Sequence, residues 1–212
     1  MLSYDDIRLI LPDHPLDVVQ RLGVEAGTNR SLVCDGIIGP KTRGAEYMDP
    51  TRVCEATSRV ALQELLSGAR EEGGNNRGSR IEAYSRGYKP NGEPQDAWCA
   101  FFASWCVDQA RKRAGLTGFQ RVGGARRLVK DHCSQVSASA LQHGDLIAWE
   151  SIARPHPYGH VGICVLVTAG HVWTIEGNAN LKPGIQGVTA RRFNADLKRI
   201  DGARMVHVGT PK

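Results

Sequence analysis

The hydrophobic period of this 212-residue chain changes near residue 144. Before that point, apolar residues recur every three to four positions, as along residues 98–110, which predicts helices. After it they alternate with period two, as along residues 161–167 and 172–176, which predicts strands. Helices followed by antiparallel strands indicate the α+β fold class.

Turn-rich segments divide the helical half of the chain. Helical periodicity covers residues 16–24, 50–66 and 81–87, and a Gly/Asn-rich run at 70–79 interrupts it. We place a boundary there, which predicts a helical module over residues 1–67 and an α+β domain over 68–212.

Charge and apolar patterning limit the partners of the chain. Lys plus Arg exceed Asp plus Glu by 27 − 22 = 5, which favours anionic partners. The basic groups at 111–113, 126–127 and 191–192 have no interleaved aromatic residues and no nucleic-acid motif, so we expect no nucleic acid as a partner. No run of eighteen apolar residues is present, so we expect no stable membrane insertion.

The six cysteines lack the spacing of a zinc site and contain no Cys-x-x-Cys pair. The chain is long enough to build its own core, so we expect most of them to be reduced and buried. We predict no metal and no cofactor.

One cysteine, Cys99, stands in the first turn of a predicted helix, with Asp96 as the expected N-cap. Unpaired amides and the helix dipole favour a thiolate at that position. Downstream, His160 opens a predicted strand, and Glu176 and Asn178 end the next one. A histidine base needs a third group to orient it, and either Glu176 or Asn178 could serve.

The strand register must bring these side chains to one face of the sheet. His160 shares a face with Glu176 and Asn178 only if paired residue numbers sum to an even number, which requires a hairpin loop of odd length. Residues 168–170, Thr-Ala-Gly, fit a three-residue turn with glycine in the left-handed position. That turn predicts His160 opposite Asn178, and Gly162 opposite Glu176.

The ordered motifs resemble the CHAP family, the cysteine- and histidine-dependent amidohydrolases/peptidases that cleave peptidoglycan. The matching segments are Trp-Cys-Ala-Phe-Phe at 98–102, Gly-Asp-Leu at 144–146, Gly-His-Val-Gly at 159–162 and Glu-Gly-Asn at 176–178. The resemblance implies a papain-like fold with Cys99 as nucleophile, His160 as base, Glu176 as orienting residue and Asn178 as a further polar member. Some family members hold calcium in an acidic loop before the cysteine, but here that loop offers only Glu93 and Asp96.

Residues 12–66 resemble the small three-helix peptidoglycan-binding module, on the Asp-Gly turn at 35–36 and the Gly-Pro helix start at 39–40. The likeness departs at the third helix, so a purely structural helical cap stays open as an alternative.

The resemblance thus implies a peptidoglycan hydrolase. An N-acetylmuramoyl-L-alanine amidase is preferred, with a stem or cross-bridge endopeptidase as the alternative. A cysteine peptidase or transglutaminase acting on proteins and a non-catalytic wall-binding virion protein are the rivals. No signal peptide is visible at the first residues, so we expect an endolysin, made in a host cytoplasm and acting on the cell wall after release, with an injected antibacterial effector as the alternative. We expect a monomer.

Overall fold

The computed structural model divides the chain into two compact units, Met1–Thr51 and Arg52–Lys212. The residues it describes are 24–25, 30–31, 53–85, 97–150, 159–167, 170–194, 196–197 and 204–212. In the first unit these form a small antiparallel hairpin of β1 (Val24–Glu25) and β2 (Arg30–Ser31). The first two helices of the predicted three-helix module lie outside the described residues.

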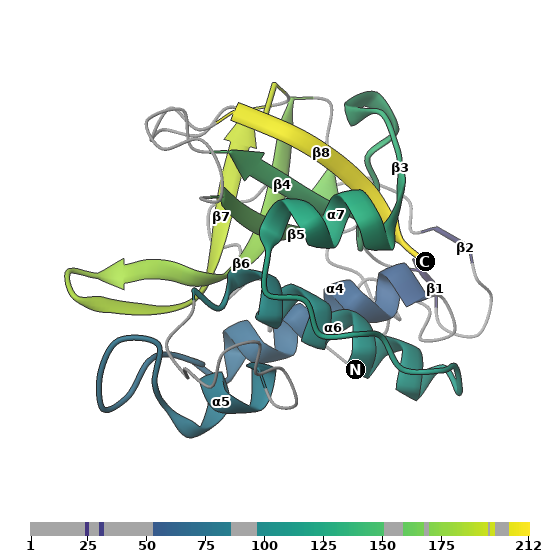
Figure 1. Cartoon of the computed structure of the whole chain (residues 1–212). Coiled ribbons are helices and arrows are strands. Elements are labelled where there is room, and N and C mark those ends of the chain that lie inside the picture. The colour runs from purple at the N-terminus through teal and green to yellow at the C-terminus, as the bar shows by residue number, and fades with distance from the viewer. Residues whose placement is uncertain are drawn as a thin grey trace. The chain divides into compact units, whose positions relative to one another are not determined.

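The second unit has the α+β architecture that the change of period predicts, and the fold class is confirmed (Figure 1). Its helices are α4 (Val53–Leu66), α5 (Ser79–Ser85), α6 (Cys99–Arg113) and α7 (Ala125–His132), with a 3-10 turn η1 at Ala138–Ala140. Its strands are β3 (Cys133–Gln135), β4 (Leu146–Glu150), β5 (Gly159–Val167), β6 (His171–Lys182), β7 (Ile185–Asn194) and β8 (Arg204–Pro211). The strands form one antiparallel sheet in the order β3-β8-β4-β5-β6-β7.

Helix α4 belongs to the second unit, although its sequence groups it with the N-terminal module. It packs against α6 and β5, and Val60 and Ala61 are buried. The Ser58 hydroxyl also donates a hydrogen bond to the carbonyl of Cys164, at 3.1 Å. Because these contacts are long-range, the compact unit starts at Arg52, whereas the sequence places the domain boundary at residue 68.

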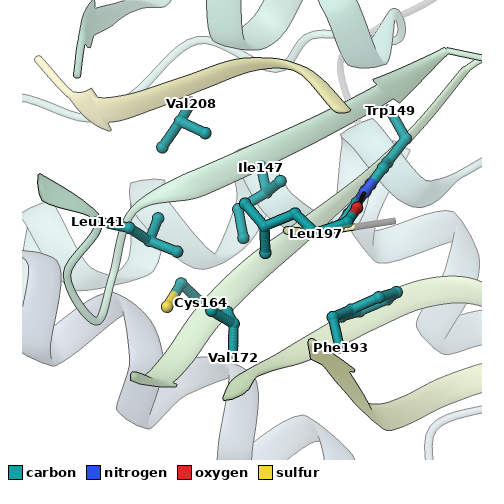
Figure 2. Packing of buried hydrophobic residues seen from close by; sticks show 8 residues of the cluster. All are labelled: Leu141, Ile147, Trp149, Cys164, Val172, Phe193, Leu197 and Val208. Carbon is teal, nitrogen blue, oxygen red and sulfur yellow. Dashed lines mark hydrogen bonds between the residues drawn. The ribbon is translucent and has the colours of Figure 1, made fainter. Parts of the chain in front are cut away.

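The sheet is buried on both faces at β4. All five residues of β4 are buried, and α7 packs against β4, β5 and β8. An apolar cluster gathers mainly from β4 to β8, and Trp149 within it donates its indole N–H to the Leu197 carbonyl at 2.9 Å (Figure 2). Trp98 and Trp173 are also buried, so Trp98, Trp149 and Trp173 all belong to the core.

Helix α6 begins at Cys99 and stops before Gly115, whose φ of +72° suits a residue without a side chain. The expected N-cap, Asp96, is wrong: the N-cap is Trp98, with no side-chain capping bond. Trp98 is fixed by distant contacts, because its indole N–H donates to Glu71 at 3.0 Å and its ring stacks on Tyr84 at 5.7 Å. Burial of a large indole therefore sets the start of the helix.

Near Ile163 and Ile175 the paired residue numbers of β5 and β6 sum to an even number, as predicted, but a bulge and not the predicted turn produces this register. The three-residue turn is wrong, because Val167 pairs with Val172 and four residues intervene. A bulge between Cys164 and Leu166 then shifts the register by one, so that Ile163 pairs with Ile175. A Cβ on Gly162 would lie 3.1 Å from Cγ of Glu176, as expected for residues facing each other.

None of the helices in the described ranges combines the length and apolar character that a membrane span needs.

Candidate active site

Cys99 is the first residue of α6 and is 4% exposed. Its sulfur hydrogen-bonds the imidazole of His160 and accepts the backbone N–H groups of Ala100 and Val161. Three donors therefore converge on one sulfur at a helix N-terminus, where the helix dipole also favours negative charge. This is the environment of a reactive thiolate.

His160, near the start of β5, connects this sulfur to a buried carboxylate. Its Nε2 lies 2.9 Å from Oε2 of Glu176, which leaves Nδ1 as the nitrogen for the sulfur of Cys99. The ring also lies beside Trp149, with ring centroids 6.4 Å apart. Two opposite hydrogen-bond partners fix the orientation of the imidazole.

Glu176 lies on β6 and is fully buried. The Thr174 hydroxyl donates to its Oε1 at 2.8 Å, and Nε of Arg191 on β7 lies 3.3 Å from its Oε2. Hydrogen-bond donors and a cation thus compensate the buried carboxylate.

The pKa values of Cys99 and His160 are shifted in opposite directions. Burial lowers the pKa of His160, but the hydrogen bonds and charges of Cys99 and Glu176 outweigh burial and raise it to about 9. Burial raises the pKa of Cys99, but the hydrogen bonds from His160 and the backbone outweigh burial and lower it. Both shifts favour the thiolate–imidazolium form of the pair over the neutral thiol and imidazole.

The structure brings three of the four predicted site residues into direct contact, namely Cys99, His160 and Glu176. No described contact joins Asn178 to them. Asn178 has a φ of 56°, and its buried Oδ1 has no hydrogen-bond partner among the described residues. Its catalytic role stays a prediction.

Gly177 lies within β6, at the register shift between Glu176 and Ala179. A Cβ at this position would lie 2.7 Å from Trp98 and 2.7 Å from Phe102 on α6. Strand β6 therefore approaches the start of helix α6 at this point so closely that only glycine fits.

Residues 71–76, which precede α5, support the start of helix α6. Glu71 accepts hydrogen bonds from the Trp98 indole and from the Asn76 backbone N–H, and its own N–H donates to the Gln186 carbonyl of β7 at 2.9 Å. The segment therefore links β7 to the residue that precedes the cysteine.

Sequence reasoning missed Arg191, Thr174 and Glu71. A signal for Arg191 was present, because Pro183-Gly184 is a turn dipeptide and Gly184 has a φ of +78°. A two-residue turn there pairs Lys182 with Ile185 and begins the β6–β7 ladder, which after two register shifts sets Arg191 opposite Thr174.

Within the described ranges, no group of three or more His, Cys, Asp or Glu residues is arranged to hold a metal ion. Glu93 and Asp96 lie outside the described residues.

Residues 88–178 match the family model described as the CHAP domain. A search of the curated proteins found no match. A solved structure described as "The crystal structure of Ly7917" aligns with 76% of this chain at 20% identity and a TM-score of 0.44, and the alignment covers 62% of that structure.

The matched segment contains Cys99, His160 and Glu176, the three residues that form one hydrogen-bonded chain. The chain is therefore similar to the CHAP domain over residues 88–178, the segment that carries these contacts.

Proposed function

We propose that the protein is a peptidoglycan hydrolase that cleaves an amide bond with Cys99 as its nucleophile. The observation that carries the proposal is the hydrogen-bonded chain from Cys99 through His160 to the buried Glu176, inside the segment that matches the CHAP domain. A thiolate activated by a histidine, which a carboxylate orients, is the arrangement that acyl transfer to cysteine requires.

In the proposed reaction the Cys99 thiolate attacks the amide carbonyl carbon and forms a tetrahedral oxyanion. The backbone N–H of Cys99, at the free end of α6, is the donor available to that oxyanion. The His160 imidazolium donates its proton to the departing amine, and the C–N bond breaks to leave a thioester. His160 then takes a proton from water, which attacks the thioester, releases the acid and restores the thiolate.

We favour the N-acetylmuramoyl-L-alanine amidase reaction over cleavage within the stem or cross-bridge. Both leaving groups are amines that need a proton from His160, so the catalytic chemistry is the same for both. The preference rests on the family resemblance. The loop segments expected to line the cleft, residues 86–94 and 152–158, lie mainly outside the described residues.

The test is mass spectrometry of purified sacculi digested by the protein. New N-terminal L-alanine identifies the amidase, and new glycine or diaminoacyl amino groups without it identify an endopeptidase. The Cys99→Ser protein is the matched control. Sacculi left unchanged by a folded wild-type protein, with binding retained, would support the wall-binding virion protein instead.

We further propose that the protein is an endolysin whose first unit binds the cell wall. The support is the division into two compact units and the resemblance of residues 12–66 to a peptidoglycan-binding module. The full-length Cys99→Ser protein should co-sediment with purified sacculi. Absence of binding would favour the alternative in which residues 12–66 form a purely structural helical cap.

A further inference from the structure

The catalytic chain continues beyond Glu176 to a charged residue on the next strand. Arg191 on β7 pairs with Thr174 on β6, and Thr189 on β7 pairs with Glu176 on β6. Paired residues share a face of a sheet, so Arg191 points to the same side as Thr174 and Glu176. Its Nε lies 3.3 Å from Oε2 of Glu176, the same oxygen that His160 contacts at 2.9 Å.

These contacts place four charges of alternating sign in one row. The thiolate of Cys99, the imidazolium of His160, the carboxylate of Glu176 and the guanidinium of Arg191 sum to zero net charge. Without the guanidinium, the row would carry one net negative charge around a carboxylate that is 0% exposed. An uncompensated buried charge of this kind is costly.

We propose that Arg191 is a positioning residue of the active site, which acts through Glu176 to hold the thiolate–imidazolium pair in its working charge state. The inference rests on the proposed roles of Cys99 and His160. Arg191 is suited to this task because the guanidinium stays charged at every pH at which the enzyme works.

Among the described residues, charged groups from three elements packed against β6 contact this row. They are His160 from β5, Arg191 from β7 and, through His160, Cys99 from α6. Removing the positive charge of Arg191 makes it easier to protonate each remaining member of the row. The proton is then lost from His160 at a higher pH, and the thiolate of Cys99 is protonated at a higher pH.

Arg191→Gln should therefore move both limbs of the pH profile upward, by about 0.5 to 1 in pH for a charge a few ångströms away at a partly exposed position. A variant with only a packing defect would lower the rate and leave both limbs in place. Arg191→Lys keeps the charge and should stay close to the wild-type profile. Arg192→Gln removes the same charge from the adjacent, exposed side chain and should move neither limb.

The acid limb is measured as the rate of iodoacetamide alkylation of Cys99 against pH, read by mass spectrometry of the peptide that contains it. The alkaline limb is measured by NMR titration of the His160 imidazole. Neither measurement uses a cell-wall substrate, so each is valid even if the protein does not hydrolyse peptidoglycan. Unchanged limbs in folded Arg191→Gln, or an equal shift in Arg192→Gln, would overturn the proposal.

If Arg191→Gln does not fold, the Glu176→Gln/Arg191→Gln protein replaces it. That protein has no uncompensated buried carboxylate, so a return of folding supports the coupling of Arg191 to Glu176. Continued failure to fold would show that Arg191 acts on something other than Glu176.

Discussion

Cys99 and Cys106 lie on the same helix, α6, and both side chains are buried, but the pKa values of their thiols are shifted in opposite directions. At Cys106, burial raises the pKa, and the nearby charge of Glu64 raises it further. At Cys99, burial has the same effect, but His160 and two backbone N–H groups outweigh it and lower the pKa. The difference shows that hydrogen-bond donors, and not depth in the core, decide which thiol can react.

The two carboxylates beside these cysteines repeat the contrast. Glu64 and Glu176 are both buried, and each has an arginine partner. Besides the arginine, Glu64 accepts a hydrogen bond from the Tyr84 hydroxyl at 2.6 Å. Glu176, besides its arginine, is hydrogen-bonded to the imidazole of His160. Neither Tyr84 nor Arg80 changes charge near neutral pH, so the Glu64 cluster holds structure together. The Glu176 cluster contains a group that can move a proton.

The largest expected difference between the two cysteines is in activity. Cys99→Ser should lower sacculus hydrolysis by at least about 10³-fold, because a hydroxyl is not ionised at neutral pH. Cys106→Ser should keep activity within about threefold and lose about 1–2 kcal/mol of unfolding free energy, because it buries a hydroxyl in place of a sulfur. Turbidity clearance of sacculi and thermal unfolding measure the two effects. A comparable loss of activity in folded Cys106→Ser would move the nucleophile to Cys106.

A second comparison uses the carboxylates. Glu176→Gln should lower activity by about 10²- to 10⁴-fold, because a neutral amide cannot stabilise the imidazolium or fix its orientation. Glu64→Gln should leave activity within about threefold and cost about 1–3 kcal/mol of stability, toward the lower end because Arg80 is 46% exposed. The measurements are initial rates on sacculi and urea unfolding. Equal activity losses in the two folded variants would contradict the division between a catalytic and a structural cluster.

The contact of Cys99 with His160, and of His160 with Glu176, could be predicted because its signal is local. A cysteine at a helix start and a histidine at a strand start can be found in the sequence, and the side-chain faces of a sheet have strict period two. The predicted facing of Gly162 and Glu176 agrees with the structure although the predicted turn is wrong, because a bulge at Val165 corrects the parity. Turn chemistry alone does not reveal a bulge two residues before the strand end.

The missed features all depend on long-range contacts. Trp98 replaces Asp96 as N-cap because Glu71 and Tyr84 hold its ring. Helix α4 joins the second unit because its apolar face packs on α6. The sequence shows Arg191 only as one of several paired basic residues, because its contact with Glu176 depends on the register of β7.

Alkylation sharpens the comparison of the two thiols without any substrate. At pH 7, iodoacetamide should modify Cys99 about 100-fold faster than Cys106, because only a thiolate reacts and burial keeps Cys106 protonated. Cys133 and Cys164, where burial also raises the pKa, should react as slowly as Cys106. Peptide mass spectrometry over time measures each rate. Modification of Cys106 at the rate of Cys99 would show that the hydrogen-bond donors to Cys99 do not control the reactivity of its thiol.

The last prediction concerns the alkaline limb of the pH–activity profile, where the expected effect is the smallest. The pKa of His160 is raised from the ordinary value of 6.5 to about 9, so the imidazolium that protonates the leaving amine persists well above neutral pH. Activity should therefore hold through pH 8 and fall to half near pH 9, as His160 loses its proton. The lowered pKa of Cys99 puts the acid limb below the ordinary range of a thiol.

Initial rates on sacculi between pH 5 and 10.5 measure both limbs. Glu64→Gln should leave the alkaline limb in place, because Glu64 contacts Arg80 and Tyr84 and not His160. A fall in activity centred near pH 6.5 in the wild-type protein would mean that the imidazole lacks the two partners that raise its pKa.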